Sequence, residues 1–475
     1  MKTVPTKTPV GRQATLRLAQ LLPGLLPLMG LGVFVPLARA SESAPLPKTL
    51  ISQPLSLAEA VNFSLRQNPS ILRAQQDLEA SQGVAIQTRA IAIPKVRVAG
   101  SYAGVQSTDI DSPSSSLAGF SFGAQQSWSS QIRLVQSLYE GGRILSGLRA
   151  ARLTKERSLL DYQTTVADVV LEVQIAYYAV LLAEQQIIVQ EKSVELLNSE
   201  LADTTRRFEA GTVPRFNVLR AEVELANQQP KLIRAKNNFR INKNRLANIL
   251  GFNIPKDTLE NIPLTLSDKL EAEPYGIDLS QAIGVALERR TELGSLRKAQ
   301  ALRHEDIVNA KAPHKPSVQA YAGYESRSSM FSSDLTINVY GWMAGVQLGW
   351  DVFDGLRTLG KVRETKALYE RAGVELDDAG RRIELEVRTA YSTFIEAKEL
   401  LESQKKVVER GEEALRLATA RSDAGSGTQL EVLSARTALT DAQTTQIQAL
   451  HDYSAARARL ERAMGLNIPA QPSQQ

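Results

Sequence analysis

Hydrophobic residues recur at every seventh position along four stretches of the chain, with a polar exception at Gln446. Sustained heptads of this kind predict long helices that pack as coiled coils. The stretch from about Ile144 to Glu209 contains no proline, which predicts a helix roughly 100 Å long at ~1.5 Å per residue. The four series are Val166, Val173, Val180, Ile187, Val194, Leu201 and Phe208; Val218, Leu225, Leu232, Phe239 and Leu246; Val387, Phe394, Leu401, Val408 and Leu415; and Val432, Leu439, Gln446, Tyr453 and Leu460.

Glycine-containing segments interrupt the heptads twice. Residues Glu209–Phe216 read EAGTVPRF, and residues Asp423–Leu430 read DAGSGTQL. Gly211 and Gly425 suit the C-caps of helices, and Pro214 suits the first turn of the helix that follows. Each half of the chain therefore predicts an antiparallel helical hairpin. A single bent helix is the alternative, and a glycine followed by a proline disfavours it.

Elsewhere the hydrophobic period falls to two, which predicts β-strands. The clearest case is Val339–Phe353, VYGWMAGVQLGWDVF, whose partner strand is Pro316–Ser326. The first half of the chain holds a weaker pair, Pro94–Gln106 and about 120–138. Half of a soluble sheet is one interpretation, but a tryptophan near each end of one face resembles the aromatic belts of membrane strands. The residues expected to face lipid are Trp342, Val346, Leu348 and Trp350.

The order of these elements is repeated, which indicates a duplication. Ser56–Pro69 aligns with Asp278–Thr291 at an offset of 222, and beyond the polar loops 107–119 and 326–338 the offset is 214. We predict a first repeat, 56–262, and a second repeat, 278–469, each with one helix, a strand pair and a helical hairpin. The strand pairs are 94–138 and 316–353; the hairpins are 143–250 and 357–464; the linkers are 41–55 and 263–277; the C-terminal tail is 470–475.

Residues 1–40 are predicted to be a signal peptide. A basic start precedes an apolar stretch that ends in Ala38-Arg39-Ala40, so cleavage is expected before Ser41. A membrane anchor is the alternative, and three prolines within the apolar stretch disfavour it. No other run is expected to reach the ~20 apolar residues of a transmembrane helix, so the mature chain is either soluble or enters a membrane as β-structure.

The net charge of +5 does not indicate a nucleic-acid partner. Five of the 56 basic residues lie in the predicted signal peptide, which has no acidic residue, so the remainder balances the 51 acidic residues. There is no cysteine, which excludes disulfides and lipidation of a mature N-terminal cysteine.

The chain shows no constellation that predicts catalysis, a metal or a cofactor. Its histidines are His304, His314 and His451, and no cysteine accompanies them. His304, beside Glu305 and Asp306, is expected on a solvated helix face. The segment Gly355–Lys361, GLRTLGK, has the spacing of a nucleotide-binding loop but is followed by valine where Mg²⁺ binding needs serine or threonine.

Four strands cannot close a barrel, because single-chain barrels begin at eight strands. Open sheet edges are not tolerated in lipid, where each unpaired backbone group costs several kcal/mol. If the strands lie in a membrane, several chains must therefore pool them.

Six short motifs in this order make the chain resemble the TolC-like outer-membrane efflux proteins along nearly its whole mature length. They are SLAEAV (Ser56–Val61) and DLSQAI (Asp278–Ile283), LYEGGR (Leu138–Arg143) and VFDGLR (Val352–Arg357), and FEAGTVPRFNVLRA (Phe208–Ala221) and SDAGSGTQLEVLSA (Ser422–Ala435).

The resemblance implies an α+β membrane protein of the Gram-negative outer membrane. It implies a homotrimer with a 12-stranded β-barrel, four strands per chain, continuous with a long periplasmic α-helical coiled-coil barrel. Such a protein is a passive exit duct of tripartite efflux or type I secretion, in contact with outer-membrane lipid, a periplasmic adaptor and an inner-membrane pump. The alternative is a soluble periplasmic coiled-coil adaptor, which the duplication disfavours.

The resemblance also implies two functional regions. The joint between barrel and tunnel would contain Tyr139, Gly141, Gly142, Arg143, Phe353, Asp354, Gly355 and Arg357. The hairpin tips at the entrance would contain Gly211, Thr212, Asn217, Val218, Leu219, Arg220, Gly425, Gly427, Glu431, Val432 and Leu433. The family's tip motif often begins with aspartate; here Asn217 and Glu431 stand in that place and Arg220 adds a cation, so an acidic entrance ring is not implied.

Overall fold

The computed structural model describes residues 54–104, 126–252, 262–329 and 334–467. All of them belong to one compact unit, Thr49–Gln475. The expected signal peptide, the polar loop 107–119 and the C-terminal tail 470–475 lie outside the described residues.

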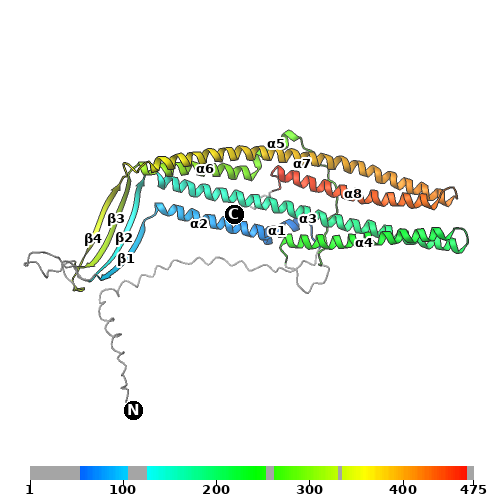
Figure 1. Ribbon diagram of the computed structural model, residues 1–475, viewed down its shortest axis with the longest axis horizontal. Coiled ribbons are helices and arrows are strands. Elements are labelled where there is room, and N and C mark those ends of the chain that lie inside the picture. The colour runs from blue at the N-terminus through cyan, green and yellow to red at the C-terminus, as the bar shows by residue number, and fades with distance from the viewer. Residues whose placement is uncertain (1–53, 105–125, 253–261, 330–333, 468–475) are drawn as a thin grey trace, which may run out of the picture. The chain divides into compact units, whose positions relative to one another are not determined.

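Long helices dominate the fold (Figure 1). In each half a 67-residue helix is followed after a short turn by a helix about half as long, and the two pack side by side as the heptads predict. The helices are α1 (Leu57–Gln67), α2 (Pro69–Arg89), α3 (Arg143–Glu209), α4 (Arg215–Leu250), α5 (Leu279–Arg289), α6 (Thr291–Lys311), α7 (Arg357–Asp423) and α8 (Gln429–Ala463), with short 3-10 turns η2 (Ala90–Ala92) and η3 (Ala312–His314).

Two helices, not the single one expected, precede each strand pair. Asn68 ends α1 and caps α2, because its side chain accepts a hydrogen bond from the Ser70 N–H at 2.7 Å and Pro69 occupies the first position of α2. The Asn68 side chain also donates to the Ile249 carbonyl at 2.7 Å, which ties this break to the end of α4.

Four antiparallel strands form one sheet in the order β1-β2-β3-β4. They are β1 (Lys95–Gly104), β2 (Gln126–Glu140), β3 (Ser317–Ser328) and β4 (Asn338–Gly349). The two hairpins share one register, since Val96 pairs with Leu134 and Val318 pairs with Leu348, which are equivalent at the offsets of 222 and 214. Pairing of β2 with β3 joins the repeats.

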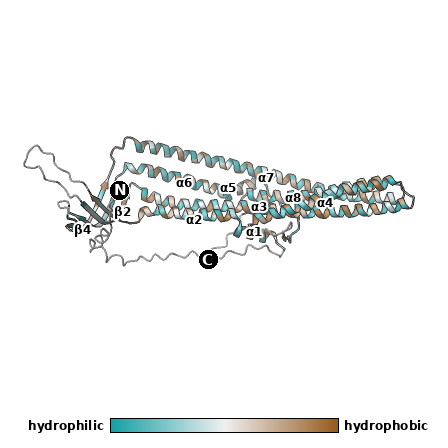
Figure 2. Cartoon of the chain, turned by 60° about the horizontal axis from the view of Figure 1, so that its bottom comes forward, coloured by the Kyte–Doolittle hydropathy of each residue, from teal (hydrophilic) through white to brown (hydrophobic). Residues whose placement is uncertain are grey.

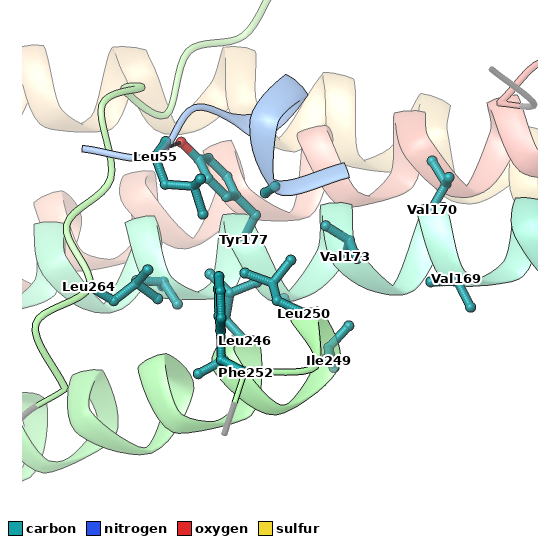
Figure 3. Close-up of a cluster of buried hydrophobic side chains, with 14 of the residues drawn as sticks. Leu55, Val169, Val170, Val173, Tyr177, Leu246, Ile249, Leu250, Phe252 and Leu264 are labelled. Carbon is teal, nitrogen blue, oxygen red and sulfur yellow. Dashed lines mark hydrogen bonds between the residues drawn. The ribbon is translucent and has the colours of Figure 1, made fainter. Parts of the chain in front are cut away.

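Each repeat has its own hydrophobic core, formed in the first by α1, α3 and α4 and in the second by α5, α7 and α8. Several core positions at the offset of 214 are buried in both repeats, as with Val173 and Val387 or Leu246 and Leu460. In the first core the Tyr177 hydroxyl donates to the Leu55 carbonyl at 2.9 Å (Figure 3).

The heptad prediction holds only in part for α3. Its first three positions, from Val166 to Val180, are buried, whereas Phe208 is 40% exposed. Toward the tip a second series at the same spacing is buried instead: Ala183, Gln190, Leu197 and Thr204. Helix α3 packs against both α4 and α8, so it needs two contact faces rather than one. Figure 2 shows apolar residues interspersed along the helices.

The expectation that no later run is apolar enough to cross a membrane was wrong for α3. By length and composition alone this is the one described helix that passes that test. Over half of its most apolar window, 56%, is buried, and Val169, Val173 and Val180 belong to the first core, which is the behaviour of a core helix.

Candidate functional site

The sheet presents one apolar face that is continuous over all four strands. Across the ladders, Val98 pairs with Ile132, Ile132 with Tyr324, and Tyr324 with Trp342, so even-numbered residues share this face. Three of the four residues expected to face lipid lie on it in β4: Trp342, Val346 and Leu348 are 84%, 67% and 68% exposed in the single chain. An exposed apolar face of this extent is expected to contact a membrane or another protein rather than water.

Trp350 lies one residue beyond the end of β4, so its assignment to the strand was wrong. Its indole N–H donates to the carbonyl of His314, the last residue of η3, at 3.3 Å, just before β3 begins. Trp342 and Trp350 still delimit nine residues, and a membrane-spanning strand takes about 9–11. Aromatic residues therefore mark both ends of the apolar stretch.

The first joint between strand and helix depends on two glycines. Gly141 has φ +63° and Gly142 has φ +103°, in the left-handed region that favours glycine. A Cβ at Gly141 would also lie 2.9 Å from the Ala312 Cα, so the joint of the first repeat touches η3 of the second. Arg143 begins α3 and is exposed, and Tyr139 is 43% exposed.

The second joint makes the same turn by other means. Gly355 and Leu356 have φ +67° and +68°, and a Cβ at Gly355 would meet nothing within 4 Å. The Asp354 carboxylate accepts hydrogen bonds from the Thr358 N–H at 2.9 Å and from the Thr358 hydroxyl, which caps the start of α7. These bonds hold the pKa of Asp354 below its usual range. Phe353 is 79% exposed, and Arg357 is exposed.

We expect Asp354→Asn to lower the thermal midpoint at neutral pH, because the amide is a weaker acceptor for Thr358. A carboxyl with a lowered pKa stabilises the fold above its unfolded-state pKa of about 3.9, and this contribution is lost as the pH falls through the folded-state pKa. The difference between wild type and variant should therefore vanish in acid. Thermal midpoints measured from pH 7 downward test this, with the exposed neighbour Asp351→Asn as the control. A gap that persists in acid would contradict the carboxylate cap.

Both hairpin tips end their first helix in the same way. The Gly211 N–H donates to the Phe208 carbonyl at 2.8 Å, and the Thr212 N–H donates to the Arg207 carbonyl at 2.9 Å. The second tip repeats these bonds at Gly425 and Ser426, and both glycines have φ +73°. This pair of bonds is a Schellman motif, which requires a left-handed residue. Gly427 follows in the second tip, and its N–H also donates to the Arg421 carbonyl at 2.9 Å.

The tips differ in what covers their second helices. Val432 and Leu433 of α8 are buried, because α8 packs against α3 as well as α7. Their equivalents in α4 are open: Val218 is half-buried and Leu219 is 48% exposed. Asn217 and Arg220 are half-buried on the same turns of α4.

Ion pairs at the tips involve both hairpins. Glu431 lies 3.4 Å from Arg421 across its own turn, and Asp423 lies 3.9 Å from Arg207 of the other hairpin. The Gln429 amide donates to Thr204 at 2.6 Å. The Arg207–Asp423 pair and the Gln429–Thr204 hydrogen bond thus connect the two tips within the chain. The ion pairs lie at exposed positions, where each contributes little alone.

Several buried polar contacts were not foreseen from the sequence. Glu305, expected on a solvated face, is buried and forms a two-bond pair with Arg149 at 2.8 and 3.0 Å. Its neighbour His304 is exposed as expected. Arg462 of α8 is buried and pairs with Glu292 at 2.7 Å and with Asp168 of α3. These pairs connect elements far apart in sequence, which no local pattern signals.

The described residues contain no group of three or more His, Asp or Glu side chains able to hold a metal ion. Lys361, the cation of the nucleotide-loop spacing, lies within α7 and pairs with Glu364 at 2.9 Å.

Comparison with known proteins identifies the family. A model described as "Outer membrane efflux protein" matches residues 60–252 and 282–466. The outer membrane protein TolC of Vibrio cholerae is 24% identical over 86% of this chain and 90% of its own length. The alkaline protease secretion protein AprF of Pseudomonas aeruginosa is 24% identical over 86% of this chain and 83% of its own length. The solved Campylobacter jejuni CmeC outer membrane channel is 18% identical, with a TM-score of 0.73 over 87% of this chain and 86% of that one. The chain therefore belongs to the outer membrane efflux protein family and is an outer-membrane protein.

Proposed function

We propose that this protein is a homotrimeric, non-enzymatic exit duct through which substrates leave the periplasm, working with a periplasmic adaptor and an inner-membrane pump. The proposal rests mainly on one observation. The two repeats pack against each other within the chain, and the equivalent surfaces at the two edges of the single chain have no such partner among its described residues. Family membership and names such as "secretion protein" for relatives support the direction of transport.

The strands supply the first half of that observation. Inside the chain, β2 of the first repeat pairs with β3 of the second. Their equivalents are β4 and β1, which are the two edges of the sheet. Pairing β4 with β1 of a neighbouring chain repeats the internal contact, and three chains give twelve strands with no open edge.

The helices supply the second half. Inside the chain, α3 packs against α8, and the equivalent contact at the offset of 214 is α7 against α4 of a neighbouring chain. Both helices expose large apolar side chains in the single chain. On α4 they are Phe216, Leu219, Val223, Ile233 and Ile241; on α7 they are Leu359, Val374, Leu385, Leu400, Val407 and Leu417.

The duplication predicts the register between chains. Since Ile132 pairs with Tyr324 inside the chain, Val346 should lie opposite Tyr102 of the neighbouring chain. The natural chain has no cysteine, so a variant with Tyr102→Cys and Val346→Cys carries only these two thiols. Facing side chains in an antiparallel pair have Cβ atoms about 4.5–5.5 Å apart, which is close to disulfide geometry.

We expect mild oxidation of this variant in membranes to give a covalent trimer in a denaturing gel. The control pair, Tyr102→Cys with Gln347→Cys, moves one thiol to the other face of the sheet and should stay monomeric in the same gel. Recovery of the mature protein in the soluble periplasm without detergent, or equal cross-linking of both pairs, would overturn the proposed assembly.

A further inference from the structure

Three cations gather on the polar face of the sheet, at the end nearest the helices. Odd-numbered residues form this face, opposite the apolar one. Side chains on this face line a hollow of about 340 Å³, and none of them is acidic. The hollow is lined by Lys95, Arg97 and Arg133 from the first repeat, together with Gln319, Tyr321 and Gln347 from the second.

The arrangement is electrostatically unfavourable by itself. Arg97 and Arg133 lie directly opposite each other on β1 and β2, and like charges in that position destabilise a sheet. The Arg133 guanidinium is fixed by stacking 4.2 Å from the centre of the Tyr321 ring. Its Nε is buried and has no hydrogen-bond partner among the described residues. A donor that is held in place and lacks an acceptor is suited to an anionic ligand.

The acidic residues near the hollow, Glu325 and Glu140, do not line it. Glu325 pairs with Gln131, which lies two residues from Arg133 along β2 and farther from the helices. Glu140, at the helix end of β2, accepts a hydrogen bond from the Ser137 hydroxyl at 2.6 Å. Neither carboxylate lines the hollow.

The second repeat shows that the fold does not need these charges. At the offsets that align the strands, Lys95 corresponds to Ser317, Arg97 to Gln319 and Arg133 to Gln347. Both hairpins have the same register, so neutral residues occupy the same backbone positions without changing the pairing. The cations are therefore specific to one repeat, and their removal should be tolerated structurally.

We infer that Lys95, Arg97 and Arg133 form an anion-binding ring inside the barrel, which attracts carboxylate, phosphate or sulfonate groups of solutes on their way out. This inference rests on the proposed trimeric duct. In a membrane barrel the apolar face is turned to lipid and the polar face to the lumen, so threefold repetition places three copies of the cluster around one channel. A confined passage lined by charge of one sign concentrates ions of the opposite sign.

Ion selectivity of the purified trimer in a planar bilayer tests the inference. Under a potassium chloride gradient, the reversal potential of the wild type should report a preference for chloride. Replacing the three cations by their second-repeat counterparts, Lys95→Ser, Arg97→Gln and Arg133→Gln, should lower the chloride-to-potassium permeability ratio by about tenfold at low salt. The difference should shrink at 1 M salt, where the screening length falls to about 3 Å.

Two controls separate charge from structure. Arg97→Lys keeps the cation and should leave the reversal potential of the wild type unchanged. Gln347→Arg adds a cation to the same hollow and should strengthen the preference for chloride. Conducting channels with identical selectivity in the wild type and the triple variant would overturn the anion ring and leave the duct intact. Absence of any conductance from the wild type would overturn the duct itself.

Discussion

Gly141→Ala should be among the most destabilising single-methyl changes in the chain. The residue would have to keep φ +63°, which costs a non-glycine residue about 1–2 kcal/mol. Its Cβ would lie 2.9 Å from the Ala312 Cα, and relieving such overpacking costs roughly 1–3 kcal/mol more. We therefore expect a loss of about 3 kcal/mol in the free energy of unfolding, measured by denaturant titration of the detergent-solubilised protein.

Gly355→Ala is the matched control for this prediction. Gly355 occupies the equivalent place in the second joint and has nearly the same φ, +67°, but its Cβ would meet nothing within 4 Å. The free energy of unfolding of this variant should therefore fall only by the conformational cost of the left-handed φ, about 1 kcal/mol. Equal losses in the two variants would show that the contact between the first joint and η3 has no energetic consequence.

Val346→Arg should prevent stable assembly in the membrane. Val346 lies midway between Trp342 and Trp350 on the apolar face, and arginine at the midplane of a barrel's lipid face costs about 2–4 kcal/mol. Each trimer would carry the substitution three times. Leu348→Arg lies nearer the helix end, so its effect should be smaller. The fraction of heat-resistant trimer recovered from membranes measures both.

Gln347→Arg is the control that distinguishes the two faces of β4. It places the same side chain one residue away, on the polar face that lines the hollow. This variant should yield as much membrane-inserted trimer as the wild type. If Val346→Arg and Gln347→Arg assembled equally well, the apolar face would not be in contact with lipid.

The pattern of hydrophobic positions predicted the elements well where one face of an element is uniform. Strand β4 alternates cleanly, and the series from Val387 to Val408 in α7 is buried throughout. The prediction was less accurate where an element has two neighbours, as in α3, because a single heptad frame describes only one contact face. It was also less accurate at strand ends: Trp350 continues the alternation of β4 but lies outside the ladder.

What the sequence could not reveal depends on contacts between distant segments. The glycine at position 141 indicated a turn, but only the structure places Ala312 against it. Charged residues such as Glu305 and Arg462 are solvated on average in sequence statistics, yet here each is buried with a partner from another helix. The break between α1 and α2 was also missed, but it does not depend on distant contacts, because asparagine followed by proline signals it locally.

The shared register of the two hairpins has an evolutionary consequence. Because each contact between repeats within a chain has an equivalent between chains in the proposed trimer, a protein of half this length would contain both complementary surfaces. Six copies of such an ancestor would then enclose the same passage as three duplicated chains in the proposed trimer. Fusion of the two halves removes the requirement that they be identical, and the repeats now differ, with cations at Arg97 and Arg133 where the other repeat has amides at Gln319 and Gln347.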